Sequence, residues 1–224
     1  MRTELLGIEV DISAWAIPLP LYGFLLATRW DDWGSLLTGL VAFPVAVLIH
    51  ELGHASAARN RGYTPLRIEI TEVGGLCTYL GRPDPRVSAG GPLTGLAVGA
   101  LLFALGFGME GTLRPEPGLA RWALVAAHIS LFINLTNLVP AHPLDGAALL
   151  RAWAHRRGRS LNEPLVGTLC GVALVAAGLG ALKIDWEAMG LAVAPVWETL
   201  LLLGLASKLV TTNLPLLIRA RLGR

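Results

Sequence analysis

Two histidines and a glutamate lie within one short apolar stretch of the chain, in the order His50-Glu51-Leu52-Gly53-His54. On a helix, residues four apart lie one turn apart on the same face, so His50 and His54 can present two imidazole nitrogens to one metal ion. Glu51 lies about 100° further round the same helix, within reach of a water molecule that the metal activates. These three residues predict zinc-assisted hydrolysis with Glu51 as the general base.

Two plainer explanations of this string are weak. With five histidines and sixteen acidic residues in the chain, chance would produce a string of this kind about 0.01 times. The second explanation is a pair of core histidines satisfied by hydrogen bonds. Three ionisable side chains inside an apolar segment are costly, however, and are usually functional. We therefore expect a metal site.

The composition indicates an integral membrane protein. Hydrophobic residues make up 54% of the chain and charged residues only 15%, and the mean hydropathy is positive, which is unusual for a soluble domain of this size. A cleavable signal peptide needs an unbroken apolar stretch near the N-terminus, but Glu4, Glu9 and Asp11 interrupt that region. We expect the N-terminus to be retained.

Apolar runs of about 20 residues predict six transmembrane helices. The candidate spans lie near residues 14–30, 34–58, 88–108, 118–138, 163–182 and 196–218. This pattern predicts an all-α polytopic membrane protein. We expect a single integral membrane protease domain over residues 1–224, with a catalytic core at about 34–157 and no added soluble domain.

The distribution of basic residues predicts the orientation of these spans. If the N-terminus is cytoplasmic, the outer side receives only Arg29, Arg114, Arg121 and Lys183, whereas the inner side receives the other arginines. Basic residues gather on the cytoplasmic side of membrane proteins. We therefore expect a multi-pass protein of the cell membrane with both termini in the cytoplasm. The net charge of +2 reflects this topology and does not indicate nucleic-acid binding.

A catalytic zinc ion normally takes three protein ligands, so the two histidines need a partner from elsewhere. The stretch Asn137-Leu-Val-Pro140-Ala-His142-Pro143-Leu-Asp145-Gly146 offers the carboxylate of Asp145. Pro140 and Pro143 stop the preceding helix, and a broken backbone at membrane depth is tolerated mainly where it lines a cavity. His142 is an alternative third ligand, because zinc accepts imidazole as well as carboxylate.

These two stretches together resemble the site-2 protease family of intramembrane zinc proteases. The resemblance rests on HELGH in one membrane helix and on NxxPxxPLDG further along the chain, and it extends to Gly91-Pro92 at the start of the third span. It covers residues 5–157. This chain has Ala147 where the family pattern often continues with a second glycine.

The resemblance implies a site and an activity. It implies one Zn2+ ion per chain and assigns these roles: His50, His54 and Asp145 as ligands, Glu51 as the base, and Asn137 as a residue that binds substrate or stabilises the oxyanion. The implied reaction is hydrolysis of a peptide bond within or near a transmembrane segment, in regulated intramembrane proteolysis. The implied partners are a transmembrane protein substrate and the lipid bilayer.

Three other functions use the same residues. The His and Asp ligands could pass a divalent metal across the bilayer, as in a transporter. The chain could also be a non-catalytic metal-binding homologue. Finally, a membrane-anchored zinc protease could act on soluble or lipid-modified peptides. The transporter gives no reason for a glutamate in the position of the base.

Between the second and third spans, Leu66 to Leu80 predicts a membrane-associated β-hairpin. Apolar residues alternate in this segment, with Gly74-Gly75 as the expected turn. An exposed strand edge can pair with an extended peptide, so we hypothesise that the hairpin captures an unwound substrate segment by strand addition. A plain connecting loop is the alternative.

Other polar residues have less specific interpretations. Asn134 lies one helical turn from Asn137, and either a substrate-facing role or an interhelical hydrogen bond explains it. His128 is expected to be a hydrogen-bonded helix contact, and His155 belongs to a solvated basic cluster. Glu198 and Lys208 are intramembrane charges, so a role for Glu198 at a lateral gate and a position at the membrane boundary are both open.

Small residues and prolines in the spans also have two interpretations. Pro44 should kink the second span, either to admit water near the metal or for packing alone. Gly91, Gly95 and Gly99 recur every four residues and predict a close approach of another helix. Cys77 and Cys170 show no CxxC spacing, so we expect apolar fillers and no thiolate metal site.

Overall fold

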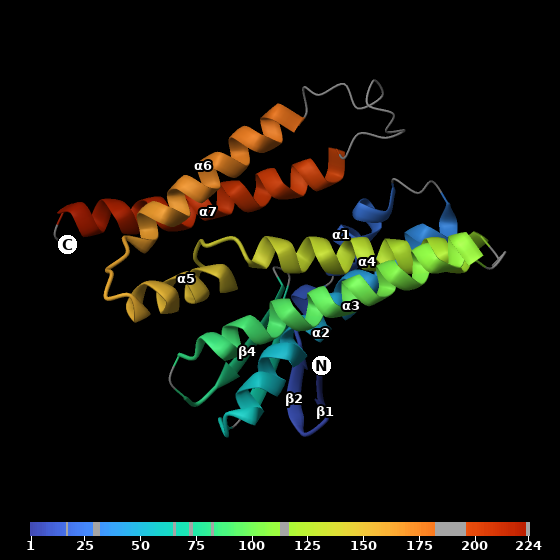
Figure 1. Ribbon diagram of the computed structural model, residues 1–224, viewed down its shortest axis with the longest axis horizontal. Coiled ribbons are helices and arrows are strands. Elements are labelled where there is room, and N and C mark those ends of the chain that lie inside the picture. Colours follow the sequence, from blue (N-terminus) through green and yellow to red (C-terminus); the bar gives the residue numbers. More distant parts are fainter. Residues whose placement is uncertain are drawn as a thin grey trace. The chain divides into compact units, whose positions relative to one another are not determined.

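The computed structural model describes residues 1–222 apart from residues 17, 29–31, 65, 72–73, 82, 113–116 and 182–195. The chain forms two compact units, Met1–Thr136 and Asn137–Arg224 (Figure 1). Among the described residues, four helical segments are long and apolar enough to cross a membrane. They are Trp33–Asn60, Pro85–Met109, Gly118–Asn137 and Thr199–Arg219. The sequence-based prediction of a mostly helical membrane protein is confirmed at this level.

Helix α2 (Trp33–Asn60) carries the HExxH string and is the central element of the first unit. It begins after Asp32, whose carboxylate accepts a hydrogen bond from the Ser35 backbone N–H at 2.8 Å. A helix leaves its first N–H groups without partners, and this cap satisfies one of them. The helix continues through Pro44 and is capped by Arg61. The predicted span 34–58 therefore corresponds to one continuous helix.

Helix α2 lies in backbone contact with helix α1 (Pro18–Ala27) and helix α3 (Pro85–Thr112). A Cβ atom on Gly23 would meet the carbonyl oxygen of Gly39, and one on Gly39 would meet that of Gly23. Gly53 and Gly90 are related in the same reciprocal way. Small residues allow this approach, which is a common basis of helix association in membranes. Two glycine pairs therefore fix α2 between its neighbours.

The first unit also contains a four-stranded sheet, which packs on α2 through β3 and β4. Its strands are β1 (Arg2–Leu5), β2 (Ile8–Ile12), β3 (Leu66–Thr71) and β4 (Gly74–Tyr79), in that spatial order. β3 and β4 are antiparallel, which confirms the predicted hairpin, and β2 lies parallel to β3. The sequence did not predict β1 and β2. The sheet is therefore larger than a hairpin.

The expected position of the hairpin turn is wrong. Gly74 pairs with Thr71 in the ladder, so Gly74 and Gly75 are the first residues of β4 and do not form the turn. A Cβ atom on Gly75 would meet the side chain of Glu51. A glycine is needed at Gly75 for this close packing on α2, and the turn does not account for it.

Helix α4 (Pro117–Asn137) packs against α3 at the end of the first unit. The Ser130 hydroxyl donates a hydrogen bond to the carbonyl oxygen of Gly95 at 2.8 Å. A Cβ atom on Gly99 would touch the side chain of Leu131. The small-residue stripe that the sequence shows on the third span is thus a packing surface for α4.

The second unit contains α5 (Asp145–Arg156), α6 (Glu163–Ala181) and α7 (Val196–Leu222). α6 and α7 pack along one another (Figure 1). The short amphipathic helix α5 was not predicted as an element. An ion pair joins it to the start of α6, in which Arg151 of α5 donates to Glu163 at 2.7 Å. The apolar stretches 18–27 and 163–177 are shorter than a membrane span.

Candidate metal centre

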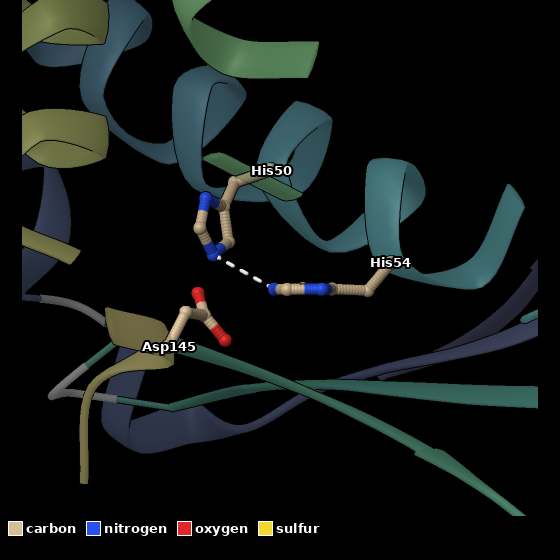
Figure 2. Close-up of side chains that lie close together, drawn as sticks. All are labelled: His50, His54 and Asp145. Atoms are coloured by element: carbon tan, nitrogen blue, oxygen red, sulfur yellow. Dashed lines mark hydrogen bonds between the residues drawn. The ribbon is translucent and has the colours of Figure 1, made fainter. Parts of the chain in front are cut away.

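The imidazole rings of His50 and His54 face one another on α2 (Figure 2). Their Nε2 atoms lie 3.1 Å apart, at the ends of the dashed line in Figure 2. The ring planes are nearly perpendicular, at 83°. Both side chains are buried, with 4% and 7% of their surface exposed. The helical spacing that the sequence predicted therefore brings the two rings together.

The other nitrogen of each ring has an oxygen acceptor. His50 Nδ1 lies 2.8 Å from the side-chain oxygen of Asn134, and the amide nitrogen of Asn134 donates to the Ser130 carbonyl at 2.7 Å. This second bond orients the amide, so its oxygen must accept from His50. His54 Nδ1 lies 2.7 Å from the carbonyl oxygen of Val87. Because oxygens of this kind only accept, both Nδ1 atoms carry the proton.

One further contact to His54 argues for the opposite tautomer. The backbone N–H of Gly91 points at His54 Nδ1 from 3.3 Å, which would require that nitrogen to be an acceptor. The contact with Val87 is shorter, and hydrogen-bond strength falls with distance. We therefore assign the proton to Nδ1 of His54 and the lone pair to Nε2.

With Nδ1 protonated in each ring, Nε2 carries the lone pair that can bind a metal ion. The two Nε2 atoms lie 3.1 Å apart. Two ligands of a tetrahedral zinc ion at ordinary Zn–N distances are separated by about 3.3 Å. The histidine pair therefore fits a zinc ion, and hydrogen bonds behind metal-bound histidines are the usual way to hold them.

Two glycines of α3 leave room for these side chains. A Cβ atom on Gly91 would meet Nε2 of His54, and one on Gly95 would meet the amide of Asn134. The stripe Gly91-Gly95-Gly99 was interpreted from sequence as packing alone. Packing is confirmed, but two of the three glycines pack directly against the histidine pair and its hydrogen-bond partner.

Glu51 lies beside the histidines and is buried, with 4% of its surface exposed. Its side chain packs over Gly75 of β4. Cys77 is on the same face of β4, and burial, together with the negative charge of Glu51, raises the pKa of the Cys77 thiol to about 12. The thiol is therefore protonated near neutral pH.

Asp145 is the first residue of α5 in the second unit. The loop before it is built from short turns, in which Ala141 N–H donates to Val139 and Leu144 N–H donates to Ala141. A Cβ atom on Gly146 would meet the carbonyl oxygens of Leu138 and Val139. Figure 2 also draws Asp145, and His50, His54 and Asp145 each offer one atom that can bind a metal ion.

The remaining predicted residues have distinct positions. Asn137 is the last residue of α4. His142 is exposed and precedes a cis peptide bond to Pro143. His128 packs beside Phe132, and His155 is exposed near the end of α5. Lys208 is exposed on α7, which also contains Glu198.

Sequence reasoning missed the Val87 carbonyl and Gly75, and it left the role of Asn134 open. A backbone carbonyl has no sequence signature, so Val87 could not be found. Asn134 lies one turn before Asn137 on α4, and the structure selects the interhelical hydrogen bond over the substrate-facing role. Gly75 is visible in the sequence as part of a glycine pair. A glycine pair between two apolar stretches is typical of a turn, so the pair was interpreted as one.

Comparison with known proteins finds sequence relatives and a solved structure of similar fold. No protein-family model matches the chain. Over 168 residues it is 34% identical to Rip3 of Mycobacterium tuberculosis, a protein named as a zinc metalloprotease; the match covers 71% of this chain and 42% of Rip3. It is 27% identical to zinc metalloprotease MJ0392 of Methanocaldococcus jannaschii, over 80% of this chain and 52% of that protein.

The fold agrees with these relatives. The solved structure of a site-2 protease from Methanocaldococcus jannaschii matches with a TM-score of 0.54 and 19% identity, and the match covers 94% of both chains. In fold the chain is therefore similar to a site-2 protease, and its sequence relatives are named as zinc metalloproteases. The chain spans about half the length of the curated relatives that it matches.

Proposed function

We propose that this protein is an intramembrane zinc metalloprotease, which hydrolyses a peptide bond within or near a transmembrane segment of a membrane protein. The observation that carries the proposal is the buried pair of facing Nε2 atoms on α2, with Glu51 beside them. This pair lies in a helix that is long and apolar enough to cross a membrane. Relatives named as zinc metalloproteases support the same activity.

We propose that His50, His54 and Asp145 hold one zinc ion per chain. Support comes from the tautomers of the two histidines, which leave both Nε2 atoms as donors to a metal. Asp145 would supply the carboxylate ligand that a catalytic site with two histidines commonly uses. When bound, zinc would act as a Lewis acid that polarises the scissile carbonyl and increases the acidity of water.

In this reaction, Glu51 takes a proton from the attacking water and then passes it to the leaving amine. Its burial strengthens each electrostatic interaction that it makes with the reacting groups. Asn137, at the end of α4, would donate a hydrogen bond to the substrate or to the developing oxyanion. A base, a ligand set and an oxyanion donor together account for peptide-bond hydrolysis.

We propose that the substrate binds as an extended strand along β4. β4 is the last strand of the described sheet, with β3 on one side. An unpaired strand edge can accept another extended chain, and a peptide bond must leave its helical hydrogen bonds before it can be cut. Gly75 of β4 packs on Glu51, so a strand paired with β4 would run close to the base.

The proposed topology has six spans with both termini in the cytoplasm. Four spans correspond to the long apolar helices. The predicted spans near residues 14–30 and 163–182, which include the shorter apolar helices α1 and α6, would supply the other two. The concentration of arginines in the loops assigned to the inner side supports this orientation. We propose that the chain is a single catalytic domain of the cell membrane, with a transmembrane protein as its substrate and no nucleic-acid partner.

The experiment that tests the function measures zinc per chain and cleavage in parallel. We expect near-stoichiometric zinc in the wild-type protein, a sharp fall in Asp145→Ala, and wild-type zinc without turnover in Glu51→Gln. Wild-type protein without zinc, or cleavage by metal-loaded Glu51→Gln, would contradict the assignment. Metal uptake into proteoliposomes without cleavage would favour the transporter. Faster cleavage of a soluble peptide than of the same sequence in a membrane span would favour a membrane-anchored zinc protease that acts on soluble or lipid-modified peptides.

A further inference from the structure

A buried asparagine on α7 contacts the loop that leads to Asp145. Asn213 has 1% of its surface exposed. Its amide nitrogen donates one hydrogen bond to the carbonyl oxygen of His142 at 2.9 Å and another to Leu209 of its own helix at 2.8 Å. The two N–H bonds of the amide are therefore both used, and one of them joins positions 71 residues apart in the chain.

The amide of Asn213 is costly where it lies. Its oxygen has no hydrogen-bond partner among the described residues, and a buried acceptor without a partner loses the free energy of its hydration. Gly167 of α6 lies against the same side chain, where a Cβ atom would meet it. An apolar side chain would avoid this cost, so helix packing does not require an amide. What the amide supplies is the donor to His142.

The loop needs such a donor. Pro140 and Pro143 have no N–H, so this segment has few donors of its own. The carbonyls of Val139 and Ala141 accept hydrogen bonds from nearby backbone N–H groups, whereas the His142 carbonyl accepts from Asn213. Asp145 follows three residues later.

We infer that Asn213 is a positioning residue for Asp145, acting through the backbone of His142. This inference rests on the proposed function, in which Asp145 is a zinc ligand. The loop is then held at two places: Gly146 packs on the carbonyls of Leu138 and Val139, and Asn213 holds His142. Removing the second contact frees the backbone before Asp145 and loosens the ligand geometry. Loss of partners outside the ligand set typically weakens metal binding 10–100-fold.

The test uses two substitutions of Asn213 in the full-length protein, purified in detergent. Asn213→Leu removes the donor and also the unpaired oxygen, and Asn213→Asp keeps the shape but not the donor. Thr211→Val is the matched control, because Thr211 is an exposed polar residue of α7 whose hydroxyl donates to the backbone of its own helix. Zinc affinity is measured by chelator competition, Co2+ absorption reports ligand geometry, and thermal unfolding of the metal-free proteins reports folding.

We expect zinc affinity to fall by about 10-fold or more in both Asn213 variants, with a weaker or shifted Co2+ spectrum and no change in Thr211→Val. Wild-type affinity and spectrum in a folded Asn213→Leu protein would overturn the inference and leave the proposed function standing. An equal loss of zinc affinity in Thr211→Val would also overturn the inference. The loss would then follow from any polar-to-apolar change on α7 and would not be specific to Asn213. Failure of the proposed function is recognised separately, by wild-type protein without zinc or by Asp145→Ala with wild-type zinc.

Discussion

The imidazole of His50 donates a hydrogen bond from Nδ1 to the side-chain oxygen of Asn134, across the boundary between α2 and α4, at 2.8 Å. Asn134 is itself held by the Ser130 carbonyl and is fully buried. This arrangement fixes both the tautomer and the ring orientation of His50. A sequence can suggest the two histidines, but the residue that makes one of them a good ligand is on another helix.

Replacement of Asn134 by leucine should weaken zinc binding by about 10- to 100-fold, because the acceptor behind His50 is lost. Asn134→Asp keeps an acceptor at the same position and should retain much more of the affinity. Chelator competition on the two purified variants measures the difference. Equal affinities in both variants and the wild type would show that His50 does not depend on this contact.

Replacement of Gly91 by alanine should displace His54, because the added methyl group would clash with Nε2. We expect zinc affinity to fall by about 100-fold, the upper end of the range for changes around the ligands. Gly108→Ala is the matched control on α3, since no atom of the described residues lies within 4 Å of a Cβ atom there. The control should keep its zinc and unfold at an equal or higher temperature. Normal zinc in Gly91→Ala would refute the predicted clash.

Replacement of Gly75 by alanine should act on Glu51 and leave the histidines in place. The new methyl group would meet the Glu51 side chain and move the carboxylate, so activity should fall, by up to the roughly 10²- to 10⁴-fold that a general base contributes. Zinc content should stay at the wild-type level. Cleavage assays beside zinc analysis separate this result from that of Gly91→Ala. A fully active variant would mean that the base tolerates the displacement.

Alkylation of Cys77 should be slow and should respond to Glu51. A thiol with a pKa of about 12 has about one thiolate per ten thousand molecules at pH 8, and the thiolate is the reactive form. Burial is the larger cause of the raised pKa, and the charge of Glu51 is the second. Glu51→Gln removes that charge, lowers the pKa and should therefore speed up labelling at a given pH. Labelling rates in a Cys170→Ala background measure this, and equal rates would show that the two side chains are not coupled.

The parts of the fold that repeat a simple pattern could be predicted from the sequence. Apolar length predicted the span that became α2, and helical spacing predicted the facing pair His50 and His54. Alternation predicted β3 and β4. These features depend on neighbours within a few residues, where the local pattern and the final structure agree.

Features that depend on distant neighbours could not be predicted. Strand β2 pairs with β3 from far away in the chain, and its short mixed sequence gives little signal alone. Gly75 was interpreted as part of a turn because its real neighbour, Glu51, is on a different element. The contact of Asn213 with His142 joins α7 to a loop near the middle of the chain, which no single-sequence pattern records.

The reciprocal contact between Gly53 and Gly90 limits how the site can open. Gly53 lies within the HExxH string, and its backbone rests directly on that of α3, with no side chain between them that could change rotamer to absorb a movement. The same two helices share the contacts of His54 with Val87 and Gly91. α2 and α3 should therefore tilt together as one rigid pair when the surrounding bilayer thins or thickens. Any displacement that admits a substrate must take place at other helix boundaries, so a cross-link between α2 and α3 should be compatible with turnover.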